Sequence, residues 1–274
     1  TPIFVDVDDE NFLIDCADLE SKITTLKAAG KLKPRAVIPV DLFGLPADYV
    51  RLAKIAGAHD LFLLGDAAQS LGGISHGRAV GGLAPATATS FFPAKPLGCY
   101  GDGGALLTDD AARAELWRLL RGHGAGKGKY DVVRVGLNSR LDTLQAAILL
   151  AKLKVFEAEI AARNRLAEKY HAALRRSVKT LPRPKGLRSA WAQYTIQHDD
   201  RDGLKTRLGE KGVPSAIYYP LPMHLQTAYR SLGDGEGSLP VTERLCQRVL
   251  SLPMHPYMDD ATAEQICEAV LASL

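Results

Sequence analysis

Short apolar runs alternate with longer amphipathic stretches along the first half of the chain. The runs are rich in aliphatic and β-branched residues, as buried strands are, and they occupy residues 3–7, 36–40, 61–64, 86–92 and 105–108. Residues 16–29 and 48–59 have the length and apolar spacing of helices. A strand, helix, strand order at this spacing predicts right-handed crossovers, and therefore an α/β fold with a mostly parallel sheet and flanking helices.

The second half of the chain begins with the longest helical pattern, over residues 139–174. A proline-containing stretch at residues 181–187 then predicts a domain boundary. We expect a large domain over residues 1–178 and a small C-terminal α+β domain over residues 179–274. In the small domain the pattern predicts strands at residues 192–197 and 212–219, a short strand and turn at 249–257, and helices at 201–211 and 260–274.

Two charged stretches have structural interpretations. Asp6, Asp8, Asp9 and Glu10 follow the first apolar run and are expected to form a solvated acidic turn. Residues 122–129 are rich in glycine and basic residues. This composition is typical of both a solvated linker and a lid near an anionic substrate, and both interpretations stay open.

One lysine stands in an unusual setting. Lys95 lies between Pro93 and Pro96, where neither a regular helix nor a central strand can continue, and glycines at residues 101–104 permit a sharp reversal into the next strand. Most loop lysines are simply solvated. A lysine that a strand end delivers into a confined site can instead lose solvation and act as an amine nucleophile.

A carboxylate at the end of the preceding strand favours the second interpretation. The apolar run from residue 61 ends in Asp66, and Gln69 follows just beyond. Open α/β sheets bind their ligands at the carboxyl ends of the strands. An amine and a carboxylate on neighbouring strand ends are the two groups that pyridoxal phosphate needs. Lys95 would form the Schiff base, and Asp66 would keep the pyridine nitrogen protonated.

Four separated motifs follow one another in order along essentially the whole chain: Asp66-Ala-Ala-Gln69, Ser90-Phe-Phe92 followed by Lys95, Gly101-Asp-Gly-Gly104 and Asn138-Ser-Arg-Leu-Asp142. With these motifs the sequence resembles the DegT/StrS sugar aminotransferases, which are fold type I pyridoxal phosphate enzymes acting on nucleotide-linked keto sugars. Residues 91–100 and 251–257 are most similar to those members that aminate UDP-2-acetamido-2-deoxy-3-oxo-glucuronate.

The resemblance implies how several residues meet the cofactor. Lys95 would be the catalytic residue and Asp66 the partner of the pyridine nitrogen. Gln69 is expected near the phenolic oxygen, and Ser90 at the phosphate. In this family the residue at Asn138 reaches across a dimer interface to the neighbouring subunit's cofactor phosphate, so we expect a homodimer with shared active sites.

The resemblance also implies the substrates. Arg140, Tyr218 and Tyr219 would lie near a nucleotide sugar, and an amino acid, glutamate by expectation, would be the donor in surface polysaccharide biosynthesis. Relatives that are dehydratases carry histidine in place of the lysine, so Lys95 favours transamination. Relatives often have histidine where this chain has Asp41, and this departure leaves a substrate role for that position open.

Composition excludes several other classes of protein. The 34 basic and 31 acidic residues leave a net charge of +3, which is too small to indicate nucleic-acid binding. The four cysteines are far apart and suit neither a metal site nor a disulfide framework, which predicts a cytoplasmic protein without a metal. No apolar window is long enough to predict a membrane span.

Members of the resembling family carry an N-terminal stretch with a small-residue turn for the cofactor phosphate and an aromatic residue that stacks on the pyridine ring. Neither occurs in this sequence, so we expect it to be a fragment of a longer protein. The alternative is a catalytically inactive or regulatory relative with the same fold. A nicotinamide-dependent oxidoreductase is a weaker alternative, because no glycine fingerprint follows the first strand.

Overall fold

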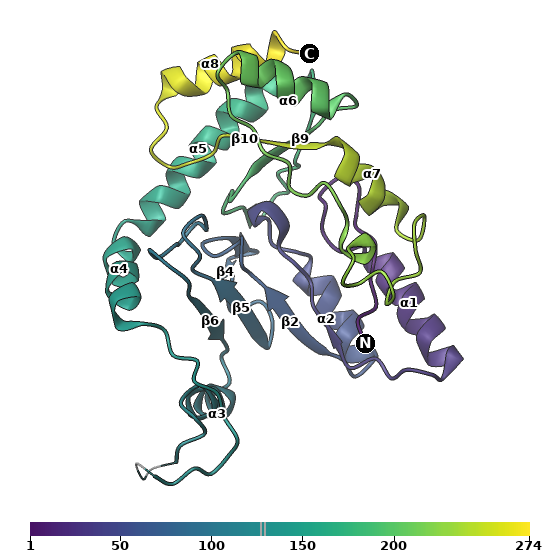
Figure 1. Ribbon diagram of the computed structural model, residues 1–274, viewed down its shortest axis with the longest axis vertical. Helices are drawn as coiled ribbons and strands as arrows, with labels where there is room; N and C mark the ends of the chain where they lie inside the picture. The colour runs from purple at the N-terminus through teal and green to yellow at the C-terminus, as the bar shows by residue number, and fades with distance from the viewer. Residues whose placement is uncertain (127, 129) are drawn as a thin grey trace.

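A four-stranded mixed sheet forms the centre of the computed structural model, which describes residues 1–126, 128 and 130–274 (Figure 1). The strand order is β1-β2-β5-β6. β1 (Ala36–Val37), β2 (Phe62–Asp66) and β5 (Ala86–Ser90) run parallel, and β6 (Gly104–Leu107) returns antiparallel to β5. The structure confirms the predicted α/β fold with its mostly parallel sheet.

Two capped helices pack against β1 and β2. α1 (Cys16–Ala29) begins where Asp15 accepts backbone hydrogen bonds and ends at Gly30, whose φ of 66° favours glycine. α2 (Tyr49–Ala58) begins with Asp48 as its cap. The buried side chains shared by these helices and strands form one core, which includes Leu19, Ile23, Val37, Leu52, Ile55 and Leu63. The core fixes β2, and with it the position of Asp66.

The single long helix predicted over residues 139–174 is wrong: the chain forms two helices there. α4 (Thr143–Leu153) is capped by Asp142, and α5 (Phe156–Leu174) follows after a short break. At the break the N–H groups of Lys154 and Val155 bond to carbonyls three residues back. Such bonds tighten the last turn and redirect the chain, which periodicity does not reveal.

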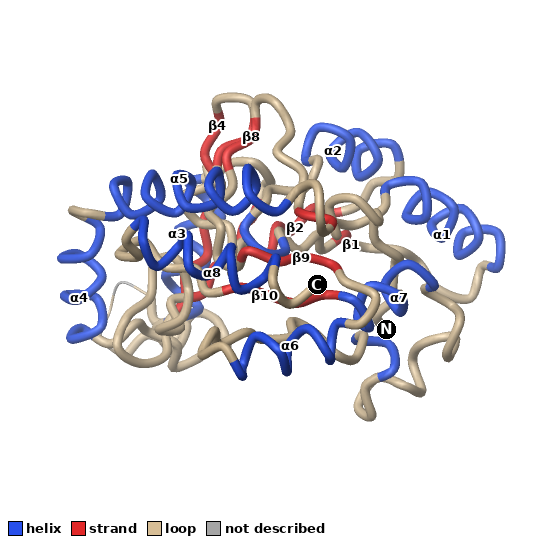
Figure 2. Tube along the Cα trace, turned by 90° about the horizontal axis from the view of Figure 1, so that it is seen from above, coloured by secondary structure: helices blue, strands red, loops and turns tan. Residues whose placement is uncertain are grey.

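A second, antiparallel sheet lies in the C-terminal part of the chain. β9 (Tyr194–Gln197) pairs with both β10 (Val249–Leu252) and β7 (Lys179–Thr180). α8 (Asp260–Leu271) lies between α5 and α6 (Arg201–Glu210) above this sheet (Figure 2). The remaining short elements are η1 (Leu42–Gly44), β3 (Ile74–Ser75), β4 (Arg78–Ala79), α3 (Ala111–Arg121), β8 (Leu187–Arg188), η2 (Met223–Leu225) and α7 (Pro240–Arg248).

Two predicted strands are reduced to isolated bridges. In residues 3–7 only Val7 pairs, with Ile14, and in residues 212–219 only Ala216 pairs, with Ser251. Pro214 lies within the second segment and Pro220 directly follows it, and proline offers no N–H to a ladder. In the basic loop predicted over residues 122–129, residues 127 and 129 lie outside the described residues.

The acidic residues near the start of the chain do more than face solvent. Asp6 is 8% exposed and accepts hydrogen bonds from the N–H of Val241 (3.0 Å) and from the N–H and hydroxyl of Thr242 (2.8 and 2.6 Å). It therefore caps the first turn of α7. Asp9 pairs with Lys179 and Arg244, at 2.8 Å each. The solvated turn expected here is wrong for Asp6 and Asp9, because no local pattern reveals such distant partners.

Asp6→Ala is expected to lower the free energy of unfolding by about 1–2 kcal/mol, as loss of a helix cap does. Burial acts to raise the pKa of Asp6, but hydrogen bonds from Thr242, Val241 and Val7 outweigh it and hold the pKa below its ordinary value of 3.8. The stabilisation is therefore present above pH 3.8 and lost as the pH falls through the lower value of the folded protein.

Urea denaturation of both proteins at pH 7 measures this effect. Glu210→Ala, at the exposed end of α6, is the control and should change the free energy of unfolding by less than about 0.5 kcal/mol. Equal midpoints for the Asp6→Ala variant and the unmodified protein would contradict a capping role.

The proposed domain division at residue 178 stays a prediction. The core of the C-terminal part includes Phe12 and Phe43 from the first part of the chain, and Leu166 and Tyr170 from α5.

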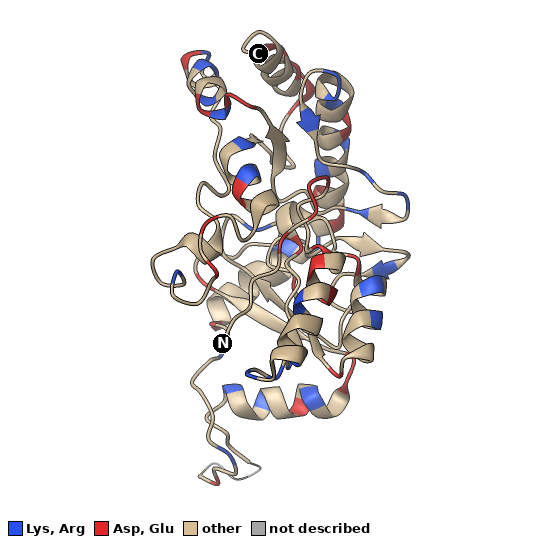
Figure 3. Ribbon diagram, turned by 90° about the vertical axis from the view of Figure 1, so that its right-hand side faces the viewer, with Lys and Arg blue, Asp and Glu red and all other residues tan. Residues whose placement is uncertain are grey.

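Charged side chains of both signs are mixed along the helices (Figure 3). Among the described residues, no helix is long and apolar enough to cross a membrane, and no group of three His, Cys, Asp or Glu residues could hold a metal ion.

Candidate active site

Two predicted site residues lie at the carboxyl ends of neighbouring parallel strands, which form one edge of the sheet. Asp66 is the last residue of β2 and pairs in register with Ala88 of β5, and Ser90 is the last residue of β5. Asp66 is half-buried, and its Oδ1 accepts a hydrogen bond from the N–H of Ala68 at 3.0 Å. No described residue donates a hydrogen bond to its Oδ2. One carboxylate oxygen therefore stays available to a ligand at this edge.

The loop that carries Lys95 connects β5 to β6 at that same edge. The N–H of Phe91 donates to Gly103 O and the N–H of Cys99 to Phe91 O, both at 2.8 Å, which closes the loop at its base. The N–H of Lys95 donates to Phe92 O at 2.9 Å. The Lys95 side chain is half-buried, and its amine has no hydrogen bond or ion pair with any described residue. The backbone is thus fixed while the amine stays available.

Helix α4 fastens the lysine loop from outside. Gln145 accepts a hydrogen bond from the N–H of Tyr100 at 2.7 Å, and the Lys152 ammonium donates to Gly98 O at 2.6 Å. Only glycine fits at position 98, because a Cβ there would lie 2.5 Å from Pro93 O. The loop geometry therefore depends on helix residues that lie 45 and 54 positions further along the chain.

Gln69 brings the two halves of the chain together. It is 6% exposed, its Oε1 accepts a hydrogen bond from the N–H of Phe43 at 2.5 Å, and its Nε2 donates to the Tyr219 hydroxyl at 3.4 Å. The rings of Tyr218 and Tyr219 lie 5.6 Å apart. Residues predicted from separate motifs, Gln69 and the two tyrosines, thus share one region next to Asp66.

Asn138 and Arg140 lie in the segment between α3 and α4. Arg140 donates to Asn138 Oδ1 at 3.1 Å, and Asn138 bridges to Gly122 at the end of α3. Leu141, the residue after Arg140, packs against the cluster that contains Leu97 and Cys99 of the lysine loop. Neither Asn138 nor Arg140 bonds to the strand-end residues described above. Ser90 uses its Oγ to accept the N–H of Phe92 at 3.2 Å.

A buried acid beside the site had no predicted role. Asp41 has no exposed surface; its Oδ2 accepts a hydrogen bond from Ser70 Oγ at 2.6 Å and its Oδ1 from the N–H of Ala47 at 2.9 Å. Burial is the main influence, aided by the negative charge of Asp66, and it raises the pKa of Asp41 to about 6 although hydrogen bonding to Ser70, Ala47 and Tyr49 lowers it. In the sequence, this hydrogen-bond network is indicated only by Ser70, which directly follows the predicted site residue Gln69.

Asp41→Asn is expected to remove a pH-dependent loss of stability. Because the pKa of Asp41 rises from 3.8 to about 6 on folding, the folded protein binds more protons than the unfolded one between these values. Stability therefore falls as the pH rises through that range, by about 3 kcal/mol from this residue. In urea denaturation, the free energy of unfolding of the variant, relative to that of the unmodified protein, should be higher at pH 7.5 than at pH 4.5. If the two proteins differ by the same free energy at both pH values, ionisation of buried Asp41 does not destabilise the fold.

The residues at the sheet edge fit pyridoxal phosphate. Asp66 offers a carboxylate oxygen that no described residue uses, which suits a pyridinium N–H. Lys95 offers a half-buried amine without a partner on a loop of fixed geometry. Gln69 offers amide N–H groups in a buried position. The carboxylate thus suits the ring nitrogen of the cofactor, the amine suits its aldehyde, and the amide N–H suits its phenolic oxygen.

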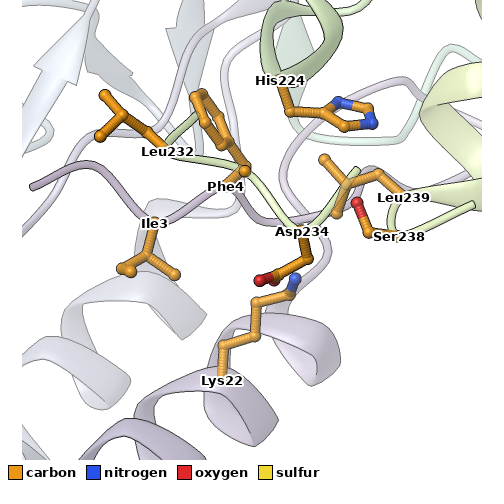
Figure 4. Close-up of a pocket in the computed structure, with 9 residues that line it drawn as sticks. Ile3, Phe4, Lys22, His224, Leu232, Asp234, Ser238 and Leu239 are labelled. Atoms are coloured by element: carbon orange, nitrogen blue, oxygen red, sulfur yellow. The ribbon is translucent and has the colours of Figure 1, made fainter. Parts of the chain in front are cut away.

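A small cavity elsewhere does not belong to this site. It lies between the start of the chain and residues 224–239, and measures about 50 Å³ (Figure 4). Its lining includes Phe4 and His224, and His224 is 1% exposed with its Nε2 3.0 Å from Glu243. None of the predicted site residues lines it. The volume suits one or two water molecules.

Comparison with known proteins identifies the family of the chain. The chain is 42% identical over 270 residues to the UDP-2-acetamido-2-deoxy-3-oxo-D-glucuronate aminotransferase of Pseudomonas aeruginosa, which covers 98% of this chain and 72% of the relative. The fold matches the crystal structure of a DegT DnrJ EryC1 StrS aminotransferase from Brucella abortus with a TM-score of 0.96 and 50% identity, over 99% of this chain and 73% of that one.

A further solved structure extends the comparison to a liganded protein. S. venezuelae DesV, crystallised in complex with a ketimine intermediate, matches with a TM-score of 0.92 and 35% identity, over 98% of this chain and 71% of that one. The model of the DegT/DnrJ/EryC1/StrS aminotransferase family matches residues 1–271. The chain therefore belongs to the DegT/DnrJ/EryC1/StrS family of pyridoxal phosphate-dependent sugar aminotransferases.

Proposed function

We propose that this chain transfers the amino group of an amino acid, glutamate by expectation, to UDP-2-acetamido-2-deoxy-3-oxo-glucuronate or a closely similar nucleotide-linked keto sugar. The relative that is 42% identical carries out this amination by name. The observation that carries the proposal is that β2 ends in Asp66, with one carboxylate oxygen that no described residue uses, beside β5, whose carboxyl end leads into the loop of Lys95. The product would be an amino sugar for a surface polysaccharide.

Pyridoxal phosphate, when bound, supplies an aldehyde to which amines attach and a ring that takes up the electrons released at the substrate carbon. Lys95 would hold it covalently through Nζ and, once released, move a proton at the substrate carbon as a general base and acid. The Asp66 carboxylate would keep the pyridine nitrogen protonated. Gln69 Nε2 would donate a hydrogen bond to the phenolic oxygen, and Ser90 Oγ would bind the phosphate.

We further propose a homodimer in which Asn138 completes the neighbouring active site. Within its own chain Asn138 bridges to Gly122 and accepts a hydrogen bond from Arg140, and it bonds to none of the described strand-end residues that would hold the cofactor. Leu137, directly before it, and Leu144 and Leu150 on α4 are apolar and 68%, 74% and 65% exposed. Contact with a second copy would bury them and favour association.

Arg140, Tyr218 and Tyr219 are proposed to contact the nucleotide sugar. Tyr219 reaches Gln69, and its ring, like that of Tyr218, is partly exposed at the same edge, where it can pack on a sugar. Arg140 would bind substrate phosphate or carboxylate from the partner's side, since it neighbours Asn138. The cytoplasmic location stays a prediction.

An amination assay tests the proposed function. The purified protein, supplied with pyridoxal phosphate and glutamate, is given in turn UDP-2-acetamido-2-deoxy-3-oxo-glucuronate, a UDP-linked 3-keto sugar without the carboxylate, and a dTDP-linked keto sugar, and 2-oxoglutarate is measured. We expect kcat/KM for the first to exceed the others at least about tenfold, which is about 1.4 kcal/mol. A preference for another sugar would refute the substrate assignment, and no turnover with any of them would favour an inactive or regulatory relative.

A further inference from the structure

The buried carboxyl group of Asp41 connects three segments that end at the active-site edge. The segment before it is paired with β2: Val40 bridges to Asp66, Asp66 N–H donates to Pro39 O at 2.9 Å, and Asp41 N–H donates to Asp66 O at 3.0 Å. The Asp41 side chain has no exposed surface. It bonds to Ser70 in the turn after β2 and to the backbone of Ala47.

Each of these contacts has Gln69 or Asp66 as an immediate neighbour. Ser70, without exposed surface, directly follows Gln69 in the chain. The turn that Asp41 closes by bonding to Ala47 contains Phe43, whose N–H donates to Gln69 Oε1 at 2.5 Å. One carboxyl group thus controls both the backbone beside Gln69 and the donor that orients its amide.

The packing around the network leaves little room for it to shift. Tyr49 is 5% exposed, and a Cβ added to Gly65 would lie 2.7 Å from its hydroxyl. Gly44 has a φ of 105°, and a Cβ there would lie 2.7 Å from the N–H nitrogen of Trp191 and 3.1 Å from Gln69 O. Glycine alone fits both positions, so the turn of residues 42–47, Tyr49 and the end of β2 pack closely against one another.

We propose that Asp41 is a positioning residue of the active site: its carboxyl group ties the end of β2, Ser70 and the turn of residues 42–47 into one unit that holds Asp66 and Gln69 in place for the cofactor. This inference rests on the proposed roles of Asp66 and Gln69. Asp41 touches neither cofactor nor substrate. It acts by restricting the two residues that do, as groups behind the first layer of an active site do.

Three variants test the proposal against a matched control. Ser70→Ala removes one hydrogen bond to Asp41 without adding volume, Asp41→Ala removes the carboxyl group, and Asp41→Asn keeps an acceptor oxygen and the size. The control is Ser251→Ala, which removes an equally buried side-chain hydrogen bond, to Thr195 at 2.8 Å, in the C-terminal sheet. For each protein we would measure the Kd of pyridoxal phosphate from its visible absorption, kcat, KM for the sugar, and the urea midpoint.

We expect Ser70→Ala to raise the Kd of pyridoxal phosphate about threefold to tenfold and Asp41→Ala more than about tenfold, with kcat falling more than KM changes. Asp41→Asn should recover most of the affinity lost in Asp41→Ala. Ser251→Ala should lower the urea midpoint as far as Ser70→Ala does and leave the Kd within about twofold.

If Ser70→Ala and Ser251→Ala give the same Kd, or if Asp41→Asn recovers nothing, the proposal is overturned. Should Asp41→Ala fail to fold, Ser70→Ala against Ser251→Ala decides it. A failure of the proposed function looks different, because then the unmodified protein itself would neither bind pyridoxal phosphate nor aminate a keto sugar.

Discussion

Lys95→Ala is expected to lower kcat for amino transfer by at least about 10⁴-fold, because the same amine would anchor the cofactor and move the proton. Lys95→Arg should be as inactive: a guanidinium keeps the positive charge but does not lose its proton at neutral pH. The comparison separates charge from nucleophilicity. Steady-state amination at saturating pyridoxal phosphate measures the loss, and borohydride reduction followed by peptide mass analysis shows which lysine carries the cofactor.

Lys154→Ala is the matched control for this experiment. Lys154 is exposed at the end of α4, on the helix that also fastens the lysine loop through Gln145 and Lys152. Its removal should leave kcat within about twofold. Turnover of Lys95→Ala within tenfold of the unmodified protein, or a reduced cofactor attached to another lysine, would refute the assignment of Lys95.

Asp66→Asn is expected to lower kcat by about 10²–10³-fold while the protein still folds. The amide keeps the shape and the hydrogen bond from the N–H of Ala68, but it removes the negative charge that would hold the pyridine nitrogen protonated. A charge placed in advance at a partly buried site supplies an electrostatic contribution of this size. Single-turnover rates with enzyme saturated in pyridoxal phosphate measure the chemical step apart from weakened cofactor binding.

The same strand provides a control for Asp66. Asp60 precedes β2 at its other end, is exposed, and has a φ of 54°, which asparagine tolerates well. Asp60→Asn therefore makes an identical chemical change at the opposite edge of the sheet. We expect unchanged kcat for it, and an Asp66→Asn variant that behaves in the same way would rule out the proposed electrostatic role.

Local signals in the sequence predicted the elements that carry the site. The caps Asp15 and Gly30 mark both ends of α1, and the apolar run before Asp66 marks β2. These features depend on neighbours within a few residues, so a pattern contains them. The lysine loop was likewise recognisable from Pro93 and Pro96, because proline restricts the backbone whatever surrounds it.

Long-range contacts explain what the sequence did not predict. The break between α4 and α5 depends on where two packed helices must turn, and the pairing of Gln69 with Tyr219 joins residues 150 positions apart. Asp41 looks like an ordinary loop acid until the structure shows Ser70 and Ala47 bonded to it. Its burial results from the meeting of three segments, which no window of residues shows.

The cap that Asp6 provides for α7 has a consequence for how the chain is made. Its partners Val241 and Thr242 lie 235 and 236 residues further on. At ordinary rates of translation the ribosome needs on the order of 10–50 s to reach them. During that interval the Asp6 carboxylate keeps its water shell and its segment stays undocked. The newborn chain therefore exposes the segment around Asp6 to chaperones and proteases until Val241 and Thr242 have been synthesised.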